Sequence, residues 1–141
     1  MAGKRVLAFD FGASSGRAIL AQYENGRIAL QEIHRFSNDP VMVRGVFYWD
    51  VLRLFFEIKQ GITKALKQGG FDAIGIDTWG VDFGLLDKKG QLMGNPVHYR
   101  DSRTVGMMEK VFETIPAEEL YRRTVIQFAH FNTIFQRAYL R

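Results

Sequence analysis

The sequence contains no cysteine, which excludes disulfide bonds, thiolate nucleophiles and cysteine-ligated metal sites and fits a reducing compartment. It has no apolar run close to the roughly 18 residues that a membrane-spanning helix needs. The apolar stretch that Asp10 interrupts is too short for a signal peptide. We therefore expect a cytoplasmic chain with no membrane partner.

Long runs of one charge are also missing. The 19 Lys and Arg residues are interspersed with 15 Asp and Glu residues, which leaves a net charge of +4. Such mixing is typical of a solvated surface, whereas a nucleic-acid-binding protein concentrates its basic residues on one face. We expect no nucleic-acid partner, although a small anion such as a nucleotide would suit the charge.

What is present is the composition of a soluble globular chain. Hydrophobic residues make up 47% and charged residues 24% of its 141 residues. No repeat, low-complexity stretch or Pro/Ser-rich linker divides it. This length predicts one continuous core, and is too short for two ordinary domains with a cleft between them.

Hydrophobic periodicity and turn residues predict strands at 5–10, 17–23, 27–36, 73–78 and 81–87, the first three as a hairpin meander. We expect the strand at 73–78 to be buried. We also expect a turn at residues 88–90 and a continuation of the sheet at residues 96–99. Asp50 can cap a helix with apolar positions at helical spacing, which Gly69 and Gly70 end. Further helices are expected at 103–115, from Pro116, and from Asn132 or Thr133.

The last predicted helix runs to Arg141 without a stop signal, from which we expect a truncated chain. The β-β-β-α-β order predicts the α/β class, with helices packed on a mixed sheet.

Residues 10–17 combine a carboxylate at a strand end with a turn of small residues. Such a turn can present several backbone N–H groups to one phosphate, since small side chains let it approach closely, and Asp10 can hold a magnesium ion. The segment is neither a P-loop nor a dinucleotide fingerprint. The alternative is an ordinary hairpin turn.

Two later segments also concentrate polar groups. Trp79 beside Gly80 offers an apolar wall and an accessible backbone, as in sugar sites; the alternative is a half-buried core tryptophan. Residues 98–104 are dense in hydrogen-bond donors and acceptors. This density indicates either a polar site or a helix cap surrounded by solvated charges. Near the end, Asn132 is either a polar site residue or a helix cap. His34, His98 and His130 lack paired metal-ligand spacing, which favours structural or exposed roles over zinc binding.

Together these segments resemble the FGGY family of carbohydrate kinases, most closely its rhamnulokinase branch. The similarity lies in motifs in the same order at 10–17, 32–36, 74–83, 99–104, 126–128 and 131–133. It implies an actin-like, ribonuclease-H-type fold, of which residues 1–141 would form the N-terminal part of the first lobe. Two residues depart from the family pattern: Val125 and His130 stand where Gly and Pro are expected.

The resemblance implies transfer of the γ-phosphoryl group of ATP to the 1-hydroxyl group of L-rhamnulose with Mg²⁺. Asp10 would place the metal, and the ATP phosphates would be lined by Ala13, Ser14, Ser15, Gly16 and Arg17. Gly80 would touch the sugar, with Trp79, Asp82, Tyr99 and Arg100 nearby. The family's general base and adenosine pocket lie beyond residue 141, so we expect this chain to hold half a site, to need the remainder of the kinase, and to be inactive alone.

Three other functions fit parts of the pattern. One is a kinase for a related ketose or polyol. A second is a ribonuclease-H-like nuclease in which Asp10, Asp77 and Asp82 hold two metal ions, although it would need a basic nucleic-acid face. The third is a non-catalytic actin-like module that binds nucleotide without turnover.

Overall fold

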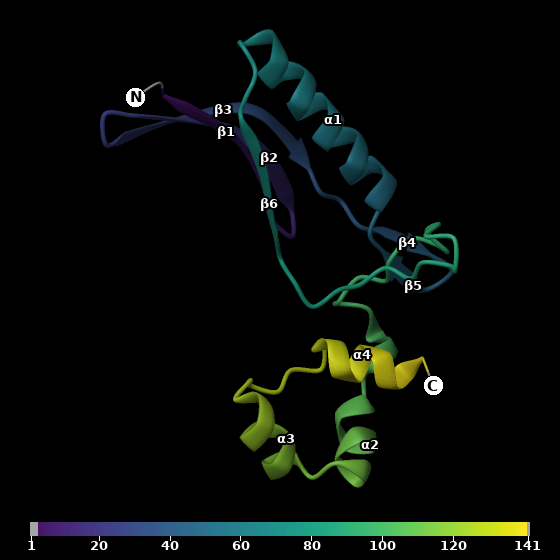
Figure 1. Ribbon diagram of the computed structural model, residues 1–141. Coiled ribbons are helices and arrows are strands. Elements are labelled where there is room, and N and C mark those ends of the chain that lie inside the picture. Colours follow the sequence, from purple (N-terminus) through teal and green to yellow (C-terminus); the bar gives the residue numbers. More distant parts are fainter. Residues whose placement is uncertain (1–2, 141) are drawn as a thin grey trace. The chain divides into compact units, whose positions relative to one another are not determined.

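The computed structural model describes residues 3–140, whose contacts divide the chain into two compact units. The sheet unit comprises residues 3–39 and 50–80, and the helical unit comprises residues 40–49 and 81–140 (Figure 1). Each unit has its own apolar cluster. The expectation of one continuous core is therefore wrong, because the chain leaves the sheet unit at residue 40, returns at 50 and leaves it again at 81.

The sheet unit is built on a mixed sheet of strands β1 (Lys4–Phe11), β2 (Ser15–Glu24), β3 (Arg27–Ser37) and β6 (Ala73–Thr78). Among the described residues their order is β3-β2-β1-β6. The first three strands pair antiparallel, as the expected meander requires, and β6 pairs parallel to β1. The mixed sheet and the α/β class are thus confirmed.

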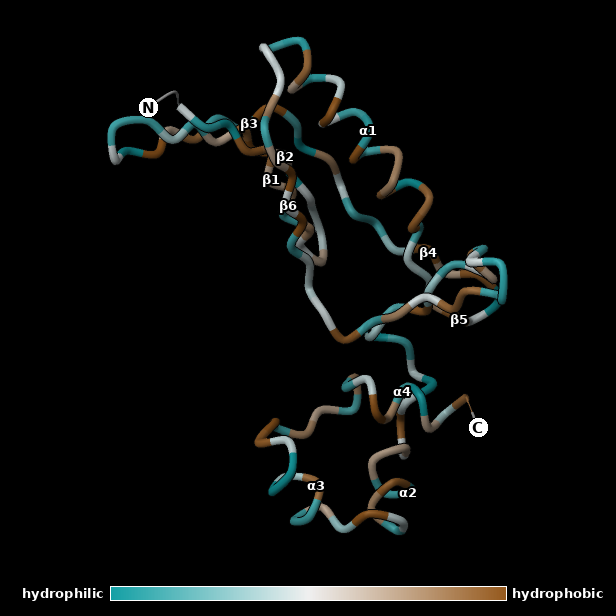
Figure 2. Tube along the Cα trace, in the orientation of Figure 1, coloured by the Kyte–Doolittle hydropathy of each residue, from teal (hydrophilic) through white to brown (hydrophobic). Residues whose placement is uncertain are grey.

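Helix α1 (Val51–Lys67) lies along the sheet in the same unit (Figure 1). Its N-terminus is capped as predicted, because the Asp50 side chain accepts a hydrogen bond from the Arg53 N–H at 3.1 Å. Gly69, with φ 93°, follows its end. Bands of hydrophobic and hydrophilic residues recur along the helix (Figure 2), and its buried residues Leu54, Gly61 and Ala65 have the spacing of one helix face, which covers the sheet.

The core of the sheet unit lies between α1 and one face of the sheet. Its buried residues are Leu7, Phe9, Phe11, Ala18, Leu20, Phe36, Leu54 and Ala65. Gly61 of α1 allows close approach, since an added Cβ would lie 2.6 Å from the Phe9 ring. Strand β6 is exposed along its length, so the prediction that 73–78 is buried is wrong. It is paired on one side, with β1, and Ile74 and Ile76 are uncovered.

The helical unit contains a hairpin and four short helices. The hairpin strands are β4 (Val41–Val43) and β5 (Val46–Tyr48), which the sequence analysis missed although a two-residue Arg44-Gly45 turn joins two apolar runs. The helices are η1 (Ser102–Thr104), α2 (Met107–Thr114), α3 (Ala117–Thr124) and α4 (Thr133–Tyr139). Met107, Leu120 and Phe135 form their buried cluster.

Three predicted elements of the helical unit differ in the structure. Residues 81–87 do not form a strand, because Val81 has a positive φ of 58° and only Leu86 makes a bridge, to Leu92 across the predicted 88–90 turn. The helix expected at 103–115 is split, since Gly106 has φ 76°. Residues 96–99 extend the small hairpin, not the main sheet, through a Tyr48–Val97 bridge. Residue Arg141, where the last helix was expected to end, lies outside the described residues.

Among residues 3–140, no helix combines the length and the apolar character needed to span a bilayer.

Candidate functional site

The β1–β2 turn in the sheet unit contains the residues assigned to phosphate binding. It is closed by a hydrogen bond from the Gly12 N–H to the Ser15 carbonyl at 2.9 Å. Gly12 is needed here, because an added Cβ would lie 2.9 Å from that same carbonyl oxygen. Ala13 and Ser15 are partly exposed and Ser14 is exposed. The tip of the turn is therefore open to a ligand.

Asn38, which the sequence analysis did not single out, holds this turn from the end of β3. Its Nδ2 donates to the Gly12 carbonyl at 2.8 Å, and its N–H donates to the Ser14 carbonyl at 3.0 Å. Its side chain is 3% exposed. No local sequence signal marks it, because its contacts are with residues more than 20 positions earlier in the chain.

Gly16 is buried, unlike Ala13, Ser14 and Ser15, the other turn residues expected to bind phosphate. It pairs with Phe36 across β2 and β3, and an added Cβ would overlap the Phe36 ring. Packing in the core therefore explains why this position is glycine. Its part in phosphate binding stays a prediction that concerns its backbone.

Asp10 lies at the end of β1 with a charged neighbour on each adjoining strand. Its register partners are Arg17 on β2 and Asp77 on β6. Arg17 contacts Oδ2 of Asp10 through Nε at 2.9 Å and Nη2 at 2.8 Å. Both side chains are 45% exposed. Asp10 is thus held by one exposed ion pair, which a competing cation or anion can open at little cost.

The donor set around Asp10 suits a magnesium ion. Mg²⁺ in phosphoryl-transfer sites is held by one or two carboxylates together with substrate phosphates and water. Asp10 and Asp77 stand opposite one another in register at the same sheet end, and both are accessible. Residues 3–140 contain no group of three side chains able to hold a metal, so phosphate or water oxygens would supply the remaining ligands.

Trp79 and Gly80 follow β6 at the end of the sheet unit. Trp79 is partly buried and packs against the apolar core cluster. Gly80 is exposed, has φ 73°, and has no atom within 4 Å of the position of a Cβ. The open space beside Gly80 is compatible with contact to a ligand, while the tryptophan ring contributes to the core.

Asp82 is the centre of a hydrogen-bond network inside the helical unit. Its Oδ2 accepts from the Trp49 Nε1–H at 2.6 Å and from the Tyr99 N–H at 3.3 Å. Its Oδ1 accepts from Nε2 of Gln136 at 2.9 Å. Trp49 and Gln136 are each 1% exposed. These partners could not be read from the sequence, because they lie 33 and 54 positions away.

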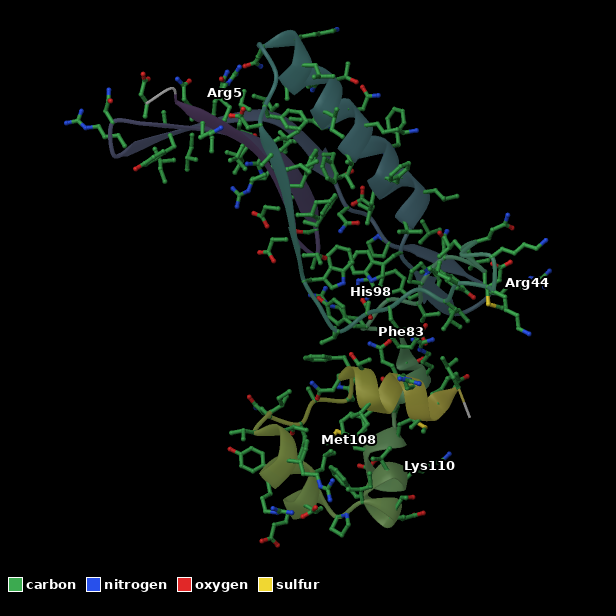
Figure 3. All side chains as sticks on the ribbon, in the orientation of Figure 1. Arg5, Arg44, Phe83, His98, Met108 and Lys110 are labelled. Atoms are coloured by element: carbon green, nitrogen blue, oxygen red, sulfur yellow. The ribbon has the colours of Figure 1, made fainter. Side chains whose placement is uncertain are left out.

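His98, Tyr99 and Arg100 follow one another in the sequence, and the His98 N–H donates to the carbonyl of Phe47 in β5 at 2.8 Å. His98 (Figure 3) is buried. The His98 ring stacks on Trp49 with ring centroids 4.0 Å apart, and burial lowers the pKa of His98, which favours the neutral ring. Arg100 is exposed and lies over the Tyr99 ring at 5.3 Å. His98 therefore has the structural role favoured from the sequence, and Arg100 is free to reach a ligand.

A helix cap accounts for part of the polar density at 98–104, but not at 126–133. Asp101 is buried and precedes η1, where its Oδ1 accepts from the Arg103 N–H at 2.9 Å and its Oδ2 from the Phe47 N–H at 2.8 Å. Asn132 precedes α4, but its Oδ1 accepts from the Ala129 N–H at 2.6 Å and not from the helix. Asp101 is thus the cap that the alternative reading described.

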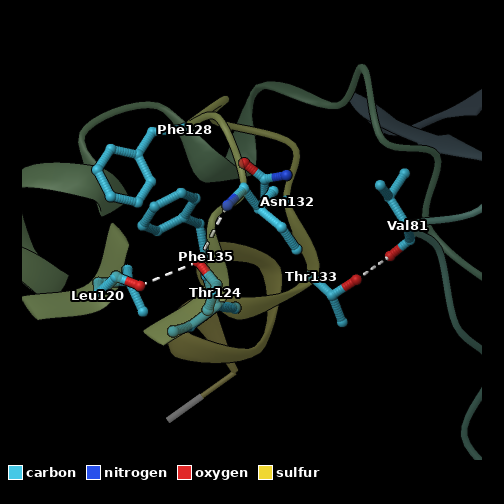
Figure 4. Close-up of a pocket in the computed structure, with 9 residues that line it drawn as sticks. Val81, Leu120, Thr124, Phe128, Asn132, Thr133 and Phe135 are labelled. Atoms are coloured by element: carbon cyan, nitrogen blue, oxygen red, sulfur yellow. Dashed lines mark hydrogen bonds between the residues drawn. The ribbon is translucent and has the colours of Figure 1, made fainter. Parts of the chain in front are cut away.

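An apolar cavity of about 340 Å³ lies within the helical unit between α3, α4 and Val81 (Figure 4). Its walls come mainly from Leu120, Ile126, Phe128 and Phe135, and Thr124 and Thr133 supply hydroxyl groups. Both hydroxyl groups already donate to backbone carbonyls, of Leu120 and Val81.

Comparison with known proteins identifies close sequence relatives. A family model described as "FGGY family of carbohydrate kinases, N-terminal domain" matches residues 5–141. The chain is 49% identical over 139 residues to a rhamnulokinase of Klebsiella pneumoniae (strain 342), covering 96% of this chain and 28% of that protein. It is 48% identical over 131 residues to a rhamnulokinase of Oceanobacillus iheyensis, covering 92% of this chain and 28% of that protein. The chain thus spans little more than a quarter of the length of these curated relatives.

Solved structures share the fold at low sequence identity. A gluconate kinase from Lactobacillus acidophilus superposes with a TM-score of 0.78 and 17% identity, over 99% of this chain and 28% of that one. A xylulose kinase from the same organism superposes with a TM-score of 0.77 and 18% identity, over 97% of this chain and 28% of that one. The expected actin-like ATPase fold, present here as a partial domain, is confirmed.

Proposed function

Because the chain belongs to the FGGY family of carbohydrate kinases, we propose that it is the N-terminal part of an enzyme that transfers the γ-phosphoryl group of ATP to the 1-hydroxyl group of L-rhamnulose. One observation carries the choice of sugar: 49% identity to a rhamnulokinase over 96% of the chain. At 17–18% identity, the gluconate and xylulose kinases support the fold alone.

The open β1–β2 turn would bind the phosphates of ATP. Backbone N–H groups of residues 13–16 would face the phosphate oxygens, and Arg17 would exchange its ion pair with Asp10 for a phosphate. Asp10, joined by Asp77, would hold Mg²⁺, which when bound neutralises charge on the phosphates during transfer. Asn38 would keep the turn in one conformation as the nucleotide enters.

The sugar would lie against the exposed backbone of Gly80, with Trp79, Asp82, Tyr99 and Arg100 nearby. In the reaction the 1-hydroxyl oxygen forms a bond to the γ-phosphorus, the bond to the bridging β–γ oxygen breaks, and ADP leaves. The hydroxyl proton goes to a carboxylate base that we place outside these 141 residues. We propose that the enzyme acts in the cytoplasm, where ATP is supplied.

The network around Asp82 disfavours the nuclease alternative. That alternative needs Asp10, Asp77 and Asp82 to hold two metal ions together. Asp82 instead directs its oxygens to Trp49, Tyr99 and Gln136, and no three-ligand metal group occurs within residues 3–140.

The decisive experiment measures kcat/KM of the full-length protein for L-rhamnulose and for a panel of ketoses and polyols, with ADP release as the readout. We expect ATP-dependent phosphorylation with L-rhamnulose preferred by at least tenfold. Preference for D-xylulose or another ketose would overturn the assigned substrate but not the kinase activity. ATP binding without turnover of any sugar would instead identify a non-catalytic module.

A further inference from the structure

Val81 adopts a backbone conformation that its side chain disfavours. Its φ is 58°, in the left-handed region, and it directly follows Gly80 with φ 73°. Glycine enters this region freely, whereas a β-branched residue does so only when surrounding contacts hold it there. The contacts that hold Val81 come from α4.

Two side chains one turn apart on α4 approach the carbonyl oxygen of Val81. The Thr133 hydroxyl donates at 2.6 Å (Figure 4), and Nε2 of Gln136 lies at 3.4 Å, the outer limit for a hydrogen bond. The same Gln136 nitrogen donates to Asp82 Oδ1 at 2.9 Å. Thr133 and Gln136 thus fix two successive residues, the carbonyl of the first and the carboxylate of the second.

Gln136 is itself held by the unit around it. Its Nε2 also donates to the Phe131 carbonyl at 3.0 Å, and its Oε1 accepts from Arg103 Nη2 at 2.7 Å. The side chain is 1% exposed, so water cannot replace these partners without opening the core. Because both the oxygen and the nitrogen of this amide are hydrogen-bonded, the side chain has few alternative positions. It therefore also restricts the positions of Val81 and Asp82.

We propose that Thr133 and Gln136 are positioning residues that hold Val81 and Asp82 in the conformation that the sugar site requires. This role rests on the proposed function, in which Asp82 lies near the sugar. Both side chains act through Val81 and Asp82. Losing the restraint should therefore weaken productive sugar binding and leave ATP binding, which uses the β1–β2 turn, unchanged.

The test compares two isosteric variants of the full-length enzyme. Thr133→Val removes the hydroxyl that donates to Val81, and the control Thr124→Val removes one that donates to the Leu120 carbonyl inside α3 at 2.9 Å (Figure 4). We expect Thr133→Val to raise the KM for L-rhamnulose about tenfold, with the KM for ATP within about twofold of the original. Thr133→Ser, which keeps the hydroxyl, should restore the original KM, and Thr124→Val should not change it.

A second variant tests the hydrogen bonds of the Gln136 side-chain amide. Gln136→Glu keeps an acceptor for Arg103 but removes the donors to Val81 and Asp82, and it sets a carboxylate against Asp82. It should raise the sugar KM more than Thr133→Val does.

Three outcomes decide the matter. A selective rise in the sugar KM, rescued by serine, supports the positioning role. A sugar KM within twofold in Thr133→Val, with a fall in melting temperature equal to that of Thr124→Val, overturns it while the kinase assignment stands. No sugar phosphorylation by the unsubstituted enzyme overturns the proposed function and the positioning role with it.

Discussion

Asp10 in the sheet unit and Asp82 in the helical unit are both candidate site residues, but their surroundings differ. Asp10 is 45% exposed and contacts one charged partner, Arg17. Asp82 accepts hydrogen bonds from three neutral donors, two of them on side chains that are 1% exposed. A carboxylate in the first setting can exchange its partner for a metal ion or release it to a phosphate. One in the second setting accepts hydrogen bonds from several donors inside its unit, which makes it part of the structure.

Asp10→Asn in the full-length enzyme should give the largest effect on activity. Asparagine has the size of aspartate but no negative charge. The site therefore attracts Mg²⁺ less strongly, while the fold persists. We expect turnover to fall about a hundredfold or more, roughly 3 kcal/mol of barrier, with partial recovery in excess Mg²⁺. Turnover measured against Mg²⁺ concentration, together with thermal melting, checks this.

Asp39→Asn is the matched control for that experiment, since Asp39 is exposed and close to the same turn. It should leave turnover unchanged at every Mg²⁺ concentration. If Asp10→Asn lowers the melting temperature but keeps near-normal turnover, then Asp10 is structural and the contrast with Asp82 disappears.

Asp82→Asn should lower the stability of the chain. The asparagine amide would face a donor, either Trp49 Nε1–H or Gln136 Nε2, and so replace one of these hydrogen bonds by a contact between two donors. We expect a loss of about 2 kcal/mol in the free energy of unfolding of the 141-residue chain, measured by chemical denaturation. Asp87→Asn is the control, because Oδ1 of Asp87 alone accepts from Lys89 and Gln91, and asparagine keeps that oxygen.

Glu57 of α1 offers a pH-dependent comparison within the sheet unit. Burial alone would raise its pKa, but hydrogen bonds from His34 at 2.6 Å and Arg53 at 2.5 Å outweigh burial and hold the pKa below the ordinary value of 4.5. Lys64 donates to the other His34 nitrogen at 2.9 Å. Because the folded pKa is the lower one, the stabilisation is complete above about pH 4.5 and is lost as the pH falls through the folded value.

Glu57→Gln should therefore flatten the acid side of the stability curve of the 141-residue chain, followed by denaturation between pH 2.5 and 6. Glu113→Gln removes an exposed carboxylate of α2 and should leave the curve unchanged. An unaltered acid limb in Glu57→Gln would show that other carboxylates govern it.

Val125→Gly should give the smallest effect, and a favourable one. Val125 ends α3 with φ 54° and is 72% exposed, so glycine relieves backbone strain while little packing is lost. We expect a gain of about 1 kcal/mol in unfolding free energy. Val105→Gly is the opposite case: Val105 is 74% exposed with φ −62°, and glycine there should destabilise the chain. Equal losses in both variants would remove strain as the explanation.

The end of α3 at Val125 is a local feature that the sequence could predict. The family pattern predicts glycine at this position, and the structure has the left-handed helix end that glycine favours, occupied by valine. The meander β1–β3, the Asp50 cap of α1 and the start of α4 were likewise predictable, because each depends on turn residues, capping residues or periodicity within a few positions.

Long-range contacts account for what the sequence did not reveal about the candidate site. Asn38 meets Gly12 across 26 positions, and Gln136 meets Asp82 across 54. Residues 81–87 have the apolar alternation of a strand, yet Val81 takes a left-handed conformation and its carbonyl accepts a hydrogen bond from Thr133 of α4. No pattern of neighbouring residues reports such partners.

The sequence by itself therefore determined the family, the order of the main elements and the presence of a small-residue turn after Asp10, since all of these are local properties of the chain. Only the tertiary structure decided that the chain forms two units, that Asp10 is accessible and that Asp82 is enclosed by Trp49 and Gln136. The reason is physical: the exposure and bonding of a carboxylate depend on which distant segments fold around it, and those segments are brought together by burial of apolar surface and not by adjacency in sequence.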